Sequence, residues 1–142
     1  MEKQSQNKIR NLIISFLLIF NGTAAIYGGL NLMLYPDGSS ISLSMVWLQH
    51  TPFNDYFIPG AILFVANGVF SVIALIAMFL RHRSYSLLVI AQGAILIGWL
   101  LIQMLLIMTI NGLHMIMAAV GLLLLILGTS VRESRMVSGH AF

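Results

Sequence analysis

The chain has 142 residues, of which 59% are hydrophobic and only 8% are charged. An average soluble domain is roughly 25% charged, and seven Lys or Arg with four Asp or Glu cannot cover the surface of such a domain. Lipid must therefore be the solvent for most of this surface. The net charge of +3 comes from scattered bases rather than a basic stripe, which argues against nucleic acid as a partner. The absence of cysteine excludes disulfides, thiolate metal sites and CxxC redox chemistry.

Four apolar stretches are long enough to cross a bilayer, whose hydrocarbon core of about 30 Å needs roughly 20 apolar residues per helix. The first stretch follows a basic start and contains small residues at Thr23, Ala24 and Ala25, as a cleaved signal peptide would. Its apolar run nevertheless continues to Leu34, which is too long for a signal core, so we expect an uncleaved span. The sequence thus predicts an all-α, polytopic, antiparallel bundle of four transmembrane helices in one domain, covering about 10–35, 52–80, 84–109 and 112–129.

The basic residues predict the orientation of these spans. Every Lys and Arg falls before the first span, between the second and third, or after the fourth: Lys3, Lys8, Arg10, Arg81, Arg83, Arg132 and Arg135. The other two connections contain no Lys or Arg, and their only acidic residues are Asp37 and Asp55. By the positive-inside rule, we expect a multi-pass inner (plasma) membrane protein with both termini in the cytoplasm.

The longest segment outside the spans, residues 36–56, is expected to be ordered and extracytoplasmic. It opens with a turn signal at Pro36, Asp37 and Gly38. Residues 41–45 fit either an extended strand, by their alternation, or one face of a helix. The second helix is expected to start at Thr51-Pro52, with Asp55 near its positive end, or alternatively at Pro59. The link 109–112 reads as a tight turn, because Asn-Gly readily takes positive φ angles.

Three stretches carry a resemblance: Tyr-Pro-Asp-Gly-Ser at 35–39, Thr-Pro-Phe-Asn-Asp-Tyr-Phe-Ile-Pro-Gly at 51–60, and Gln92-Gly93 through Gly98-Trp99 to Gln103. Together they resemble a group of small bacterial four-helix membrane proteins with no assigned activity. A looser resemblance links the chain to DoxX-like membrane proteins, which are compact four-helix bundles with an outer first loop. Some of those proteins are linked to quinone-dependent sulfur oxidation. The chain lacks a clear match to the arginine and lysine positions of their first helix.

Polar groups inside the spans are few. Ionisable residues are absent once the ends are trimmed, which argues against proton-coupled transport. The amides of Asn21, Asn67 and Gln92 fall near mid-membrane and suggest either a polar ligand pocket or, by our preference, hydrogen bonds that hold helices together. Pairs of small residues four apart indicate close packing, within the bundle or in a homodimer. They are Ala24 with Gly28, Ala25 with Gly29, and Ala94 with Gly98.

The outer mouth of the predicted bundle gathers six further polar residues, which form a candidate ligand pocket: Asn31, Asp37, His50, Asp55, Gln103 and His114. Their spacing matches no metal-ligand or haem pattern. Ser42, Ser44, His50 and Asp55 include the residue types of a hydrolase triad, but no nucleophile elbow accompanies them. We therefore assign neither catalytic nor metal-binding residues, and the cofactor stays unknown.

Two functions follow as hypotheses. The first is a membrane protein without catalytic activity that binds a lipid-like small molecule or assembles with a membrane partner. The alternative is a DoxX-like subunit associated with quinone or redox chemistry, as the looser resemblance implies.

Overall fold

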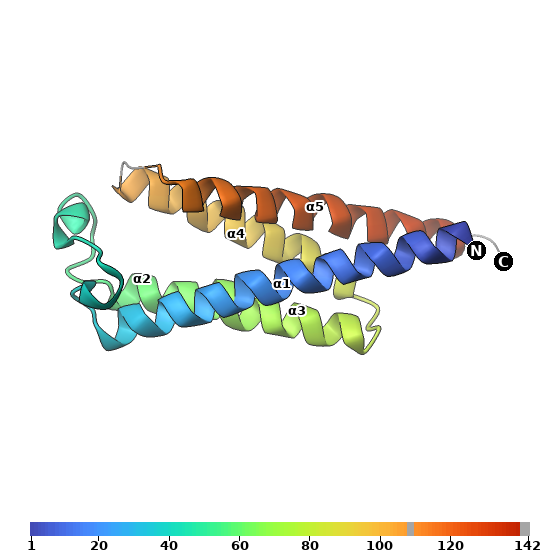
Figure 1. The fold of residues 1–142 in the computed structure, drawn as a ribbon, viewed down its shortest axis with the longest axis horizontal. Coiled ribbons are helices and arrows are strands. Elements are labelled where there is room, and N and C mark those ends of the chain that lie inside the picture. The colour runs from blue at the N-terminus through green and yellow to red at the C-terminus, as the bar shows by residue number, and fades with distance from the viewer. Residues whose placement is uncertain (108–109, 140–142) are drawn as a thin grey trace.

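The computed structural model describes residues 1–107 and 110–139, with side chains described for all of these except 106, 107 and 139. The predicted fold class is confirmed: the molecule is an all-α bundle built on four long apolar helices (Figure 1). The first span is α1 (Glu2–Leu34). The second is a continuous helix made of α2 (Phe57–Ile62), the π-helical η3 (Leu63–Val69) and α3 (Phe70–Phe79). The third and fourth are α4 (Tyr85–Ile107) and α5 (Gly112–Gly139).

The chain is a small multi-pass membrane protein, because each span is long and apolar enough to cross a bilayer. The start of α1, the end of α5 and the turn between α3 and α4 lie at one end of the bundle (Figure 1). We call it the basic end, because all seven Lys and Arg belong to it. The opposite end carries residues 35–56 and is called the loop end (Figure 1).

Two helices extend further at the basic end than the sequence predicted. Helix α1 begins at Glu2 rather than near residue 10, and α5 continues to Gly139 rather than stopping near 129. Apolar periodicity marks only the part of a helix that faces lipid. The polar turns beyond it continue both helices although most of their residues are exposed, and Arg10 donates across from α1 to Ser130 and Ser134 of α5.

The second span starts at Phe57, so the predicted start at Thr51-Pro52 is wrong. The Thr51 hydroxyl donates to the carbonyl of Leu48 (2.9 Å) and accepts the N–H of Phe53 (3.2 Å), which closes a local turn and not a helix. Pro59 lies in the first turn of α2. The N–H groups of a first turn have no partner within the helix, so a proline there costs no hydrogen bond. The alternative start near Pro59 was therefore nearer to the structure.

The bundle consists of two helix pairs. Helix α1 packs along the whole second span, and α4 packs along α5. Gly29 and Gly60 mark the closest approach in the first pair: a Cβ on Gly29 would lie 2.8 Å from the Gly60 carbonyl oxygen, so only glycine fits. Ala25 and Gly29, a predicted small-residue pair, are both buried, whereas Gly98 has no atom within 4 Å of its Cβ position and Ala94 is exposed.

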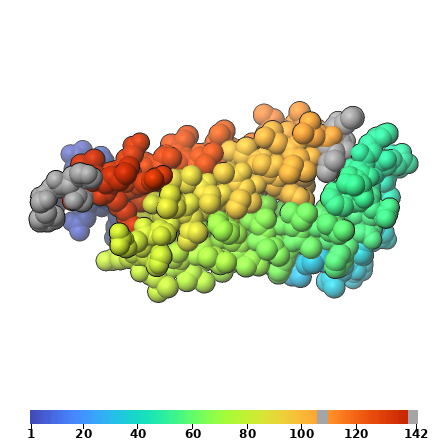
Figure 2. All heavy atoms as spheres, turned by 180° about the vertical axis from the view of Figure 1, so that it is seen from behind, coloured from blue at the N-terminus to red at the C-terminus, as the bar shows by residue number. Residues whose placement is uncertain are grey.

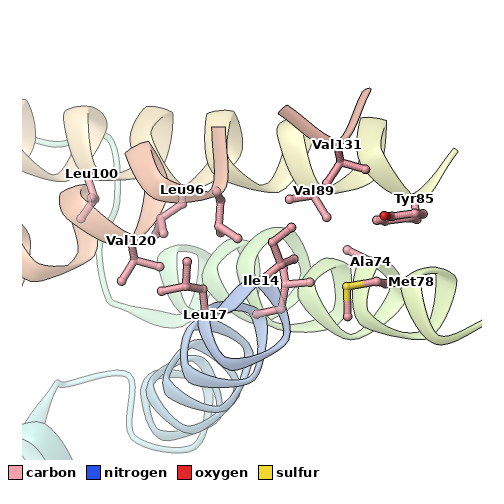
Figure 3. Close-up of a cluster of buried hydrophobic side chains, with 12 residues drawn as sticks. Ile14, Leu17, Ala74, Met78, Tyr85, Val89, Leu96, Leu100, Val120 and Val131 are labelled. Carbon is pink, nitrogen blue, oxygen red and sulfur yellow. The ribbon is translucent and has the colours of Figure 1, made fainter. Parts of the chain in front are cut away.

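A core of apolar side chains from all four spans joins the two pairs (Figure 3). Ile14 and Leu17 of α1 and Ala74 of α3 face Val89 and Leu96 of α4 across this core. Leu100 and Val120 carry this core towards the loop end along α4 and α5. At the loop end itself, the segment 35–56 bridges the two pairs, because it contacts both α1 and α4.

Residues 35–56 form an ordered lobe at the loop end, visible in the space-filling view of Figure 2. The lobe contains two short 3-10 turns, η1 (Ser39–Ile41) and η2 (Met45–Leu48), separated by Ser42 in the left-handed region (φ 55°). Residues 41–45 therefore form neither the strand nor the longer helix that the sequence allowed. Leu48 and Tyr56 pack on Leu32 of α1 in a small second core, while η2 contacts α4.

The predicted turn at 109–112 lies partly outside the described residues. Within the described part, Asn111 and Gly112 do not take positive φ angles, and Gly112 is the first residue of α5. The Nδ1 atom of His114 accepts the backbone N–H of Asn111 (3.2 Å), so this histidine helps to start the helix.

Candidate functional site

The six residues predicted to line an outer pocket lie at the loop end, and four of them bond to groups close to them in the chain. Asp37 accepts the Ser39 N–H and hydroxyl (3.1 and 2.7 Å). Asp55 accepts the Phe57 N–H at the start of α2 (2.9 Å). The amide of Asn31 donates to the Tyr27 carbonyl one turn earlier (2.8 Å), and His114 holds the start of α5.

The remaining two predicted residues differ in exposure: His50 is exposed and Gln103 is half-buried. Among the residues that the structure describes, no three His, Cys, Asp or Glu side chains group closely enough to hold a metal ion. The chemistry visible at this end is turn formation and helix capping. Whether the six residues also receive a ligand stays a prediction.

Two titratable groups at the loop end are shifted by their surroundings. The hydrogen bond from the Ser39 hydroxyl, supported by its backbone N–H, lowers the pKa of Asp37 below its ordinary value of 3.8. Burial raises the pKa of Tyr56 above its ordinary value of 10.0. That hydroxyl donates to the Ser44 carbonyl (2.7 Å), and the Tyr56 N–H donates to Pro36 (2.8 Å). Tyr56 thereby fastens the lobe to the start of α2.

The three predicted mid-membrane amides come together in one fully buried cluster. The Asn21 amide donates to the Ser71 hydroxyl (2.9 Å), and Gln92 donates to Asn67 Oδ1 (3.2 Å). Asn67 lies in the π-helical η3, whose wider turns aim it between α1 and α4. These bonds connect three spans, which is what the interhelical hydrogen-bond interpretation expects. Asn21 Oδ1, Asn67 Nδ2 and Gln92 Oε1 have no partner within the described protein.

Sequence reasoning missed a different group at the basic end, centred on Arg10. This half-buried guanidinium lies between α1 and α5 and donates to Ser130 (3.2 Å), Ser134 (3.2 Å) and the side chain of Asn7 (2.9 Å). All three acceptors are neutral, and the buried Nε atom has no partner. Among the described residues, Arg10 therefore has hydrogen bonds but no compensating negative charge.

A cavity of about 440 Å³ opens beside Arg10. Its polar lining includes Lys3, Gln6 and Asn7 of α1 with Ser130 and Ser134 of α5. Ile9, Ile13 and Leu127 supply the apolar part. Neither Asp nor Glu is among the residues that line it, so the cavity combines hydrogen-bond donors and positive charge with apolar surface. We call it the α1–α5 cavity.

A second cavity of about 330 Å³ lies on the other side of α5 and is lined by Arg83, Arg132 and Arg135 with Ser86, Leu87 and Met136. Here Arg135 already has partners: it donates to the carbonyls of His82 (3.4 Å) and Arg83 (3.0 Å) and its guanidinium lies 4.3 Å from the Tyr85 ring centre. Arg135 thus ties α5 to the turn between α3 and α4, a structural role.

The sequence held one signal for the α1–α5 cavity. Ser130 and Ser134 are four residues apart and therefore share a helix face, beyond the apolar run of the fourth span. Arg10 lies just before the apolar run of the first span, in an antiparallel neighbour. The sequence analysis used Arg10 only as an indicator of topology, which hid its pairing with these hydroxyls.

Comparisons with known proteins add no further guide to the chemistry. The chain matches none of the protein-family models, curated proteins or solved structures that were searched. The fold and the site therefore define a class only, that of a small four-span membrane protein.

Proposed function

We propose that this chain is a plasma-membrane protein that acts by binding a lipid-like amphiphile in the α1–α5 cavity, without chemical catalysis. The observation that carries the proposal is that the cavity is lined by both polar and apolar side chains. Lys3, Arg10 and Ser130 offer hydrogen-bond donors, while Ile9, Ile13 and Leu127 offer apolar contacts. A ligand with a polar head and an apolar body suits such a lining.

The residue types in the cavity favour binding over chemistry. A guanidinium carries five N–H donors and no acceptor, so Arg10 is suited to binding an anion and not to removing a proton. Its hydrogen bonds to serine hydroxyls use those oxygens as acceptors, and the Ser134 hydroxyl donates to the Ser130 carbonyl (2.8 Å). Neither hydroxyl has a base to activate it among the residues that line the cavity.

Native mass spectrometry after gentle extraction tests the proposal. We expect wild-type protein to retain one or more lipid-like adducts, and Leu127→Arg, which fills the apolar part of the cavity with charge, to lose them. Leu123→Arg is the matched control on the same helix, because Leu123 is exposed and does not line the cavity. Protein that carries no adduct, or an unchanged adduct in Leu127→Arg, contradicts the proposal. A retained quinone would instead support the redox alternative.

The proposed orientation puts the basic end in the cytoplasm, because all seven bases of the chain belong to that end. The absence of native cysteine makes this simple to test with single-cysteine variants. We expect Asn54→Cys at the loop end to react with a membrane-impermeant maleimide in intact cells, and Lys8→Cys to react only after permeabilisation. The reverse pattern would invert the orientation.

A further inference from the structure

We infer that the α1–α5 cavity recognises the phosphate group of an anionic phospholipid, with Arg10 as its main donor. This inference rests on the proposed function, in that it names the headgroup of the amphiphile that the cavity holds.

The first argument is the uncompensated charge of Arg10. A half-buried guanidinium normally lies against a carboxylate, because removing its charge from water is unfavourable without a counter-charge. Here its partners are two hydroxyls and an amide oxygen, all neutral. These bonds fix the guanidinium in place without neutralising it. Three of its five N–H groups make these bonds, so the Nε–H and one N–H of Nη2 remain as donors for a phosphate.

The second argument is depth in the membrane. Helix α1 has 33 residues and is about 50 Å long, which exceeds the hydrocarbon core of about 30 Å. Its apolar run begins at Leu12, so the surplus length lies at the basic end and Arg10 comes half a turn before the run starts. Arg10 therefore lies at the level of the lipid phosphates and not in bulk water.

The third argument is the order of side chains along the cavity. From the terminus inwards, the lining residues of α1 are polar up to Arg10 with the single exception of Ile9, and the deepest is the apolar Ile13. Helix α5 runs the opposite way and repeats the same order, with Ser134 outermost, Ser130 next and Leu127 deepest. Both walls thus change from polar to apolar in the direction of the hydrocarbon core. A phospholipid seated with its phosphate at Arg10 would direct its acyl chains along Ile13 and Leu127.

Charge also favours an anion at this end. All seven bases but only two acids, Glu2 and Glu133, belong to it, and neither acid lines the cavity. Both are exposed. The field at the mouth of the cavity is therefore positive and attracts anionic headgroups over neutral ones.

The test compares lipids that differ in the headgroup. Purified protein in detergent is titrated with phosphatidylglycerol, with phosphatidylethanolamine and with a diacyl galactolipid, which has acyl chains but no phosphate. Binding is read by native mass spectrometry and by the shift in melting temperature. We expect phosphatidylglycerol to bind about tenfold more tightly than the galactolipid, the gain typical of a charge-assisted pair. Phosphatidylethanolamine, with phosphate but no net charge, should fall between them.

Variants assign this preference to Arg10. Arg10→Gln should lower the affinity for phosphatidylglycerol to that for the galactolipid, and Arg10→Lys should recover part of the difference. Lys8→Gln is the matched control: it makes the same change in net charge on the same helix, but Lys8 is exposed and lies outside both cavities. Melting temperatures without lipid show whether each variant is folded.

The outcomes separate the two proposals. Equal binding of galactolipid and phosphatidylglycerol would overturn the phosphate inference while leaving amphiphile binding intact. An equal loss in Lys8→Gln and Arg10→Gln would overturn it too, since diffuse surface charge would then explain the preference. Absence of binding by any of the three lipids would overturn the proposed function itself. Inorganic phosphate that displaces phosphatidylglycerol at millimolar concentration, and stabilises the protein equally, would identify a free anion as the ligand and overturn the lipid assignment.

Discussion

The two ends of the bundle treat their polar groups in opposite ways. At the loop end, Asp37, Asp55 and Tyr56 each bond to a nearby backbone group, and the result is a closed lobe. At the basic end, Arg10 is held by neutral side chains and faces a cavity. Polar groups whose hydrogen bonds are met within the chain stabilise the fold. A positioned charge without a counter-charge can instead bind a ligand. The sequence analysis placed its candidate pocket at the loop end, where Asp, His and amide side chains flank the spans, and used the bases of the other end only to orient the chain.

The largest effect expected from this contrast is at Gly38, which has φ 75° in the turn that starts the lobe. Gly38→Val places a branched side chain in the left-handed region, with its Cβ 2.8 Å from the Leu43 carbonyl oxygen. We expect a loss of about 3 kcal/mol in the free energy of unfolding, measured by denaturant titration in micelles. Gly98→Val is the control, because nothing lies within 4 Å of that Cβ position. Equal losses in both variants would show that the positive φ of Gly38 and its close contacts are not what makes the substitution unfavourable.

A smaller loss is expected for Tyr56→Phe. The ring stays in the small core with Leu32 and Leu48, but the hydrogen bond to the Ser44 carbonyl is removed. Unfolding in the same assay should become easier by about 1 kcal/mol. Tyr35→Phe, at an exposed position, should change nothing measurable. A stable Tyr56→Phe variant would mean that the lobe does not depend on this bond.

Removal of the Asp55 carboxylate should have a similar or slightly smaller effect. Asp55→Ala leaves the Phe57 N–H at the start of α2 without its acceptor, and we expect a loss of about 0.5–1 kcal/mol. The neighbouring Asn54→Ala, at an exposed residue, serves as the control. If amphiphile binding, and not stability, responds to Asp55→Ala, the loop end belongs to the binding site and the contrast fails.

At the basic end the corresponding prediction is an absence of loss. Arg10→Met replaces an uncompensated, half-buried charge by an apolar side chain of similar length, so the loss of three hydrogen bonds is offset by removing the cost of desolvating an unpaired charge. Without added lipid, the free energy of unfolding should stay within about 0.5 kcal/mol of wild type. A penalty larger than that of Tyr56→Phe would make Arg10 a structural residue and remove the difference between the two ends.

The smallest effect concerns acid. The Ser39 hydrogen bonds lower the pKa of Asp37 in the folded protein, so the carboxylate adds stability that is complete above its ordinary pKa of 3.8. That stability is lost as the pH falls through the lower folded value. The melting temperature of wild type should therefore exceed that of Asp37→Asn by a constant amount above pH 3.8 and by less below it. A difference that does not change with pH would mean that the charge of Asp37 does not stabilise the turn.

Much of the fold could be predicted because lipid imposes one simple rule. Apolar length specified four spans, and the structure contains them. Ends were harder: residues 2–9 and 130–139 are polar helix, which apolar periodicity does not reveal. The start at Phe57 was missed because Thr51 and Pro52 have the residue types of a helix start while forming a turn.

The candidate site was less predictable for a different reason. Asn21, Asn67 and Gln92 could be grouped from sequence, because each amide is a polar exception in an apolar helix. Arg10 is not such an exception, since arginine is ordinary at the cytoplasmic border of a span. Its significance depends on Ser130 and Ser134, which are 120 and 124 residues away. Only the packing of α1 on α5 brings them together.

The π-helical stretch in the second span means that this span cannot lose a residue there without rotating one of its contact surfaces away from α1. Seven residues, Leu63–Val69, are wound more widely than in an α-helix, and the Phe70 N–H bonds to Val65, five residues earlier. The stretch separates Gly60, which meets Gly29, from Ser71, which meets Asn21. Deletion of one residue here would restore regular winding and rotate Gly60 by about 100° relative to Ser71. The additional residue of the π-helical stretch thus sets the rotation between the Gly60 and Ser71 contact surfaces, so that both face α1.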